Sequence, residues 1–347
     1  MSRVQTLKIE AADADQRLDR WLRRQFPHLG QGRIEKMCRK GELRVDGGRV
    51  KPATRLAVGQ QVRIPPLPDP NAPVPDYAAK VSEADAKLIQ SCVIYRDDHV
   101  IALNKPPGLP VQGGSKQARH VDGLSEALRF GADEKPRLVH RLDKDTSGVL
   151  VLARNHQAAK GLTAAFRHRA TRKIYWAVVA GVPMPRNGTI RYGLVKAPGH
   201  GARGEGEKML CLHPRDVDAT PGAKHATTDY AVLEPAGSRT AWVALTPITG
   251  RTHQLRAHMA EIGHPIIGDG KYGGSGQENL GDGWGAQLGG DISKKLHLHA
   301  RSLVIEHPVT KALLNLTAPL PKHMAHTWET FQWQPSEAPD DPFEDWE

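Results

Sequence analysis

The chain of 347 residues contains only three cysteines, Cys38, Cys92 and Cys211, which lie far apart and form no C-x-x-C pair. This pattern supports neither a disulfide framework nor a metal site built from paired thiolates. The sequence also lacks a run of roughly 20 apolar residues, and charged residues occur throughout its first thirty positions. We therefore expect a cytoplasmic protein that is neither secreted nor inserted in a membrane.

Motifs for common cofactors are missing as well. The sequence has no Walker A motif and no convincing dinucleotide-binding fingerprint, because the glycine-rich stretch 201–208 follows no clear strand and lacks G-K-[ST]. His253 and His258 are five residues apart and fall on different sides of a helix, whereas His297 and His299 would share one face of a strand. No carboxylate or thiolate pattern accompanies these histidines, so we predict no metal site.

Acidic residues are in deficit. The formal net charge is +10 and the isoelectric point is about 9.5. Residues 1–64 contain fifteen Lys or Arg against seven Asp or Glu, so this short segment carries +8 of the total. A basic protein attracts polyanions, since each neutralised phosphate releases a counterion, and nucleic acid is the partner that this distribution favours.

Proline and glycine divide the chain into segments. Residues 65–75 contain six prolines, which lock φ and remove N–H donors, so we predict a semi-rigid linker over 65–88. It separates a basic domain, 1–64, from a larger domain, 89–330. An acidic tail at 335–347 is predicted to be disordered.

The basic domain shows two amphipathic periods, around Leu18 to Phe26 and Ile34 to Cys38, followed by short alternating strands around Asp46-Gly47. Its basic side chains either form a phosphate-binding surface or are only the solvated faces of two helices. The stretches 16–21 and 39–47 resemble the S4 RNA-binding domain, which favours RNA. The residues that we expect to contact RNA here are Arg20, Arg24, Arg33, Lys36, Arg39 and Lys40.

The larger domain alternates β-rich runs with helix-like stretches, which indicates an α+β fold with a large sheet. Its densest polar segment runs from Arg137 to Gly148 and leads into an apolar strand. A calcium loop starting at Asp143 would need an acid at its twelfth position, where Arg154 stands. Two interpretations stay open: a self-satisfied polar turn, and a catalytic aspartate held rigidly at a cleft beside His140 and Arg141.

Four ordered motifs resemble those of the RluA-type pseudouridine synthases. The hallmark His-Arg-Leu-Asp is present at 140–143. The stretch 94–109 resembles the motif upstream of it, 172–181 resembles the strand that carries a tyrosine, and 249–265 resembles the motif downstream. Together with the S4-like segment, the similarity spans nearly residues 12 to 320. It implies the pseudouridine synthase fold, with a large mixed, mainly antiparallel sheet, plus a small N-terminal S4-like domain.

The resemblance implies an enzyme that isomerises uridine without a cofactor. Asp143 would be the catalytic carboxylate, either as a nucleophile at the sugar or as a base that starts glycal formation. Arg256 would supply its cation and Tyr175 would stack on the uracil and help to remove the C5 proton. Arg141 would fill the gap that the flipped base leaves, with His140 close by. The residues expected to support the pocket are Leu255, Arg251 and Lys105.

The expected partner is structured RNA, above all large-subunit (23S) ribosomal RNA, bound by a monomer. The alternatives are a synthase of the same family that acts on transfer RNA, and a non-catalytic RNA-binding factor for ribosome assembly. The simultaneous presence of Asp143, Tyr175 and Arg256 argues against the non-catalytic alternative, because binding alone does not require all three.

Overall fold

The computed structural model describes residues 4–67, 81–113, 119–167, 171–197, 208–273 and 292–344. The chain forms two compact units, Met1–Ala79 and Lys80–Glu347. Most of the proline-rich linker and of the glycine-rich stretches at 197–206 and 273–290 lies outside the described residues, so the predictions for those residues stay predictions. The linker prediction was wrong for residues 83–88, which belong to the helix α3 (Glu83–Ser91), because the Ser82 side chain caps a helix there.

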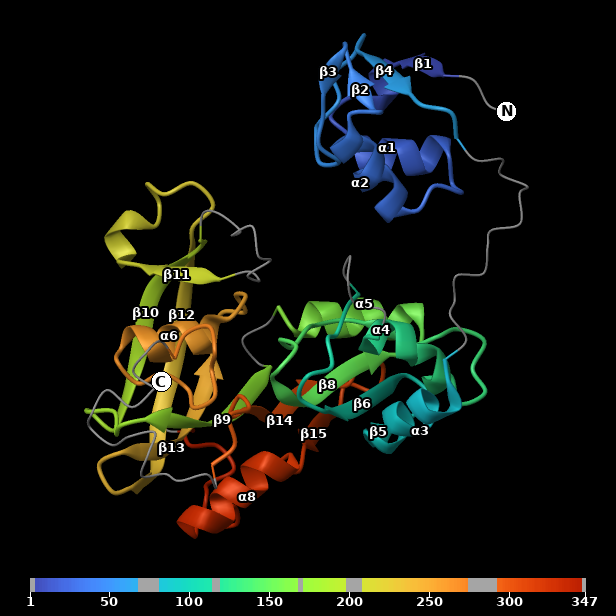
Figure 1. The fold of residues 1–347 in the computed structure, drawn as a ribbon. Coiled ribbons are helices and arrows are strands. Elements are labelled where there is room, and N and C mark those ends of the chain that lie inside the picture. The colour runs from blue at the N-terminus through green and yellow to red at the C-terminus, as the bar shows by residue number, and fades with distance from the viewer. Residues whose placement is uncertain are drawn as a thin grey trace. The chain divides into compact units, whose positions relative to one another are not determined.

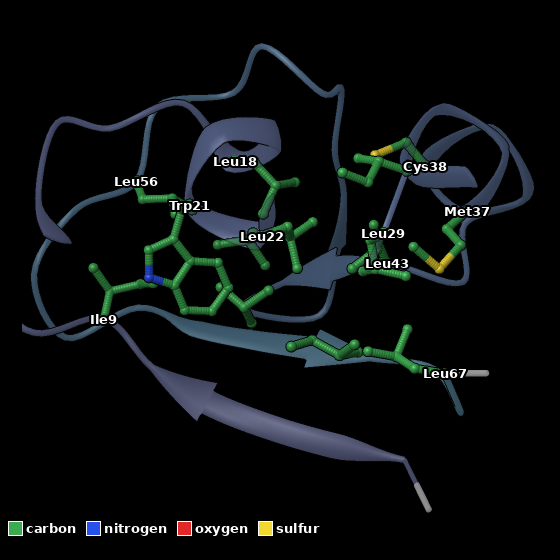
Figure 2. Close-up of a cluster of buried hydrophobic side chains, with 14 residues drawn as sticks. Ile9, Leu18, Trp21, Leu22, Leu29, Met37, Cys38, Leu43, Leu56 and Leu67 are labelled. Carbon is green, nitrogen blue, oxygen red and sulfur yellow. The ribbon is translucent and has the colours of Figure 1, made fainter. Parts of the chain in front are cut away.

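The small unit packs two helices on a four-stranded sheet of order β1-β4-β2-β3. Leu18, Trp21 and Leu22 from the first helix, with Ile34 and further apolar side chains, form its core (Figure 2). The second helix ends at Gly41, whose φ of 69° places it in the left-handed region that favours glycine. The elements are α1 (Leu18–Gln25), α2 (Gln31–Lys40), β1 (Gln5–Lys8), β2 (Arg44–Val45), β3 (Gly48–Arg49), β4 (Gln61–Ile64) and the short 3-10 helix η1 (Ala11–Asp13).

In the described part of the large unit, eleven strands join one sheet whose main path runs β11-β10-β12-β13-β9-β14-β8-β6-β5 (Figure 1). The pairing of β14 with β8 is parallel and the other pairings of described strands are antiparallel, which confirms the mixed, mainly antiparallel sheet. The strands are β5 (Val93–Arg96), β6 (Val100–Lys105), β7 (Arg137–Leu138), β8 (Ser147–Ala153), β9 (Arg172–Ala180), β10 (Asn187–Lys196), β11 (Met209–Leu212), β12 (Lys224–Ala236), β13 (Thr240–Pro247), β14 (Leu298–Glu306) and β15 (Leu313–Thr317).

Helices cover both faces of this sheet. On one face, α3 (Glu83–Ser91) and α4 (Val121–Leu124) pack on β6 and β8, and α6 (Gln254–Glu261) packs on β9 and β13. On the other face lie α5 (His156–Ala165) and α8 (Lys322–Phe331). Side-chain caps start three of them: Ser82 accepts from the Asp85 N–H at α3, His120 Nδ1 accepts from the Gly123 N–H at α4, and Asn155 accepts from the Ala158 N–H at α5. Two short 3-10 helices, η2 (Ser125–Leu128) and η3 (Pro214–Asp216), complete the unit.

Three paired residues of β8, β14 and β9 set the distance between the loop that precedes β8 and the strand β9. Ala300 of β14 pairs with Gly148 of β8 on one side and with Tyr175 of β9 on the other. Gly148 has a φ of 108°, and a Cβ there would lie 2.2 Å from the Ala300 carbonyl oxygen. Only glycine fits this close approach, which brings the loop before β8 beside β9.

The acidic tail differs from its prediction. Phe343 is only 1% exposed and packs with Trp333 in the aromatic cluster around Trp328. Arg172 of β9 donates two hydrogen bonds to the Asp341 carboxylate, at 2.6 and 2.7 Å. The expectation of disorder was wrong for this part of the tail, because burial of Phe343 and the ion pair of Asp341 with Arg172 hold it on the sheet.

Candidate active site

A cavity of about 570 Å³ opens where β8, β9 and α6 converge. It is lined by the loop that precedes β8, by Tyr175 and Lys173 of β9, and by the turn and first residues of α6. The sequence motifs at 140–143, 172–181 and 249–258, which are distant along the chain, therefore meet in one place. The lining includes Asp143, Tyr175, Arg256, His140, Arg141, Leu255 and Arg251 among the residues that the sequence singled out.

The Asp143 carboxylate lies beside the Arg256 guanidinium. Arg256 Nη1 donates to Asp143 Oδ2 at 3.4 Å, and the Asp143 side chain is 25% exposed, so a ligand in the cavity can reach it. The predicted cation is thus in place, although its bond to Asp143 is a long one. Arg256 is a buried residue of α6, and its orientation is set by a different carboxylate.

That second carboxylate is Asp269, which the sequence analysis did not assign a role. Arg256 Nε and Nη2 donate to its two oxygens, each at 2.7 Å, and its side chain is fully buried. Asp269 Oδ1 also accepts from the Lys271 and Tyr272 N–H groups. Burial by itself would lower the pKa of Arg256, but the hydrogen bonds to Asp269 and the charges of Asp269 and Asp143 raise it overall. The guanidinium group of Arg256 is therefore charged and held in one orientation by Asp269, with its Nη1 turned toward Asp143.

His253 is a second neighbour of Asp143 that the sequence analysis treated only as a rejected metal ligand. Its Nε2 lies 3.9 Å from Asp143 Oδ2, and its Nδ1 lies 3.0 Å from the Tyr272 hydroxyl, which itself accepts from the Met209 N–H. Burial lowers the pKa of His253, although the charge of Asp143 opposes this shift. His253 also has a φ of 52° at the start of α6, a conformation that is uncommon outside glycine and is frequent at functional sites.

Lys105 contacts the backbone of the loop that carries Asp143. Its side chain is buried, and its ammonium donates to the carbonyls of Pro106, Leu109 and Lys144, each at 3.0 Å. Lys144 follows the candidate catalytic residue directly, so Lys105 fixes the backbone that carries it. Burial lowers the pKa of Lys105 to about 7, against the opposing charges of Asp145 and Asp143. This geometry is that of a scaffold lysine.

His140 and Arg141 differ in their surroundings. His140 Nε2 accepts from the Val151 N–H at 2.8 Å, and its ring stacks on Phe166 with centroids 4.2 Å apart. Burial, and to a lesser extent the charge of Lys173, lower the pKa of His140 to about 3, so the ring is neutral. Arg141 is exposed at the cavity wall. Their contacts with RNA stay predictions.

Tyr175 lines the same cavity as Asp143 and is half-buried. Burial raises the pKa of its phenol and the charge of Asp143 raises it further, so the hydroxyl keeps its proton at neutral pH. Leu255 is buried beside it in the same apolar cluster. Arg251 is exposed and donates to the His225 carbonyl at 3.2 Å, which holds it at the rim.

The basic side chains predicted for the small unit are exposed on α1 and α2. Two of them already have acidic neighbours: Arg24 pairs with Asp13, and Lys40 lies 3.7 Å from Glu42. Their role in RNA binding stays a prediction. Within the described ranges, no group of three or more His, Cys, Asp or Glu side chains is arranged to hold a metal ion. Nor is any helix that the structure describes long and apolar enough to span a membrane.

An aspartate fixed by a locked arginine in a cavity of nucleotide size, in a chain with a basic helix-and-sheet unit, has the layout of an RNA-modifying enzyme. Comparisons with known proteins agree. Residues 99–261 match the family described as RNA pseudouridylate synthase, and residues 16–62 match the S4 domain.

The chain is 34% identical over 334 residues to "Ribosomal large subunit pseudouridine synthase C" of Vibrio cholerae, covering 93% of this chain and 95% of that protein. It is also 34% identical to "RNA pseudouridine synthase 4, mitochondrial" of Arabidopsis thaliana, covering 88% and 77%. Among solved structures, "Human RNA Pseudouridylate Synthase Domain Containing 4" superposes with a TM-score of 0.54 at 32% identity, covering 71% of this chain and 95% of that one. The chain belongs to the RNA pseudouridylate synthase family, and it is an enzyme that isomerises uridine in RNA.

Proposed function

We propose that this pseudouridine synthase acts on specific uridines of large-subunit (23S) ribosomal RNA and that Asp143 is its catalytic carboxylate. The observation that carries the proposal is the partly exposed Asp143 carboxylate beside the locked Arg256, in a cavity that Tyr175 also lines. The ribosomal substrate is supported by the similarity to synthases named for the large ribosomal subunit, over 95% of the length of the Vibrio cholerae protein.

In the proposed reaction the bond between ribose C1′ and uracil N1 breaks, the base turns, and C1′ joins C5. The C5 proton leaves and N1 gains one, so the product is an isomer of the substrate. Asp143 acts on the ribose, either as the nucleophile at C1′ or as the base that starts glycal formation. Both routes need an ionised carboxylate, and the Arg256 cation stabilises that form.

We assign Tyr175 to stacking on the uracil, in an aromatic contact that excludes water from the reacting bond. The raised pKa of its phenol disfavours a tyrosinate that would take the C5 proton. This refines the sequence expectation, which gave Tyr175 a share in that proton transfer.

A uridine in folded RNA reaches the cavity only when it leaves its stack, at a cost of about a few kcal/mol. Arg141 is exposed at the entrance and is our candidate to occupy the vacated position, with the neutral His140 ring bracing the loop against β8. The exposed basic side chains of α1 and α2 would bind phosphates of the same RNA. We propose that the chain works in the cytoplasm as a monomer. Light scattering with and without RNA tests the monomeric state.

The test is pseudouridine mapping of large-subunit ribosomal RNA from cells that lack the protein, complemented with wild type or Asp143→Asn. We expect defined sites to disappear and only the wild type to restore them. If no ribosomal site changes, the ribosomal substrate is wrong and transfer RNA is mapped next. Restoration by Asp143→Asn would contradict the role of this carboxylate.

A further inference from the structure

Lys173 is a cation in the cavity that the reaction described above does not use. It lies two residues before Tyr175 on β9, so its side chain leaves the strand on the same side, and both residues line the cavity. The Lys173 side chain is half-buried, and its charge reaches His140, whose pKa it helps to lower. Lys173 is thus at the cavity wall, on the same face of β9 as Tyr175 and near His140 of the loop that leads to Asp143.

The ammonium of Lys173 lacks the compensation that the other buried cations of the site have. Arg256 is neutralised by Asp269 and Asp143, and Lys105 donates to three carbonyls. Burial lowers the pKa of Lys173, and no carboxylate among the described residues opposes this shift. A partly desolvated charge without a partner is unfavourable, and such groups mark places where a ligand supplies the counter-charge.

We propose that Lys173 binds a phosphate that flanks the target uridine, on its 5′ or its 3′ side. The inference rests on the proposed function, since it requires the uridine to lie between Tyr175 and Asp143. With the base stacked on Tyr175 and the ribose at Asp143, the two phosphates of that nucleotide are the anions brought to the cavity wall. The uracil carbonyls are neutral and would leave the charge uncompensated, whereas a phosphate oxygen compensates it, and lysine binds phosphate as a point charge.

A cycle between protein and RNA tests this contact. The probe is an RNA hairpin with one uridine that the wild type converts, prepared with normal linkages or with a neutral methylphosphonate on the 5′ or 3′ side of that uridine. Affinities are measured for Asp143→Asn and for Asp143→Asn combined with Lys173→Met, so that no turnover occurs. Asp143→Asn with Lys160→Met, which removes an exposed lysine on α5, is the matched control.

We expect Lys173→Met to weaken binding about 10- to 100-fold and to reduce the salt dependence by about one phosphate contact. One methylphosphonate should weaken binding of the protein with Lys173 by a similar factor and have little effect once Lys173 is Met. The control should respond to both linkages like the protein with Lys173. If the effects of Lys173→Met and of each methylphosphonate multiply independently, the proposal is overturned.

The comparison of RNA linkages can be made with the protein that keeps Lys173, so it remains valid if Lys173→Met fails to fold. If this protein binds each of the two RNAs with a neutral linkage as tightly as it binds the normal RNA, the contact is refuted. Failure of this proposal is separable from failure of the proposed function. Conversion of the hairpin by wild type and not by Asp143→Asn establishes the role of Asp143 whatever the cycle shows.

Discussion

The substitution Asp269→Asn tests whether a buried ion pair holds the catalytic arginine. Asn keeps the size of the side chain but places an amide where Arg256 now finds a carboxylate oxygen. Both bonds from Arg256 are 2.7 Å long, and the two side chains are only 6% and 0% exposed. Water therefore cannot replace the lost charge.

Removing one partner of a buried pair costs about 3–5 kcal/mol. Arg256 would keep only its contact with Asp143, at 3.4 Å, to compensate its buried charge. Total stabilities of about 5–15 kcal/mol are usual, so this is a large fraction. We also expect pseudouridine formation to fall about 100-fold, since the Nη1 group of Arg256 is no longer aimed at Asp143. Denaturant unfolding and single-turnover conversion of RNA measure the two effects.

Asp218→Asn is the matched control, because Asp218 is exposed and its contact with His225 is a surface pair at 3.4 Å. Its loss should change stability by less than about 0.5 kcal/mol. The double variant Arg256→Met with Asp269→Leu should recover most of the stability but no activity. If Asp269→Asn unfolds at the same denaturant concentration as Asp218→Asn, the argument that the ion pair orders this site is refuted.

Three further variants test other parts of the structure. The pKa of Lys105 is about 7 in the native state and 10.5 in the unfolded chain, so the native state binds fewer protons between these pH values and its stability should rise with pH there. Lys105→Met should flatten this rise when unfolding is measured as a function of pH. An unchanged slope would show that Lys105 has no lowered pKa in the native state. In His253→Asn, asparagine can adopt the positive φ at this position, but the imidazole beside Asp143 is lost. Conversion of uridine should slow about 10-fold, while stability should stay within about 1 kcal/mol of the wild type. A wild-type rate would exclude a role for His253. Phe343→Ala should cost about 3–5 kcal/mol in thermal unfolding, and a melting temperature like that of wild type would show that the tail contributes no packing.

The sequence singled out Asp143, Tyr175 and Arg256 because each belongs to a short motif that resembles one of the family, and the structure places all three in the lining of one cavity. Asp269 follows a glycine in an unremarkable turn, and its importance depends on the position of an arginine thirteen residues earlier. The same holds for the Tyr272 hydroxyl, whose partners His253 and Met209 come from different elements. Such contacts arise from tertiary packing and leave no signal in local spacing.

The tail shows a different limit of sequence reasoning. Its average composition is acidic and polar, which is typical of disorder. Ordering is determined by single residues that an average hides: Phe343 joins the aromatic cluster on the sheet, and Asp341 pairs with Arg172. The carboxylate of Asp341, which in the sequence is one of several acidic residues in a polar tail, thus forms an ion pair with Arg172 of β9.

The parallel contact between β8 and β14 gives a prediction about how the sheet itself positions Asp143. Gly148 is the second residue of β8 and follows Asp143 by five positions, and a methyl group there would lie 2.2 Å from the carbonyl oxygen of Ala300, which pairs with Tyr175 on its other side. Gly148→Ala must therefore push β8 away from β14 and so move Asp143 relative to Tyr175.

Gly131→Ala separates this displacement from backbone strain alone, because Gly131 also has a positive φ, 85°, but nothing lies within 4 Å of the added methyl group. The control should lose about 1–2 kcal/mol of stability and keep its activity. Gly148→Ala should lose more stability, and those molecules that still fold should convert uridine at least about 100-fold more slowly, because a shift of about 1 Å between reacting groups has that effect. Equal activity of the two variants would mean that the spacing between β8 and β9 does not set the geometry of the reaction.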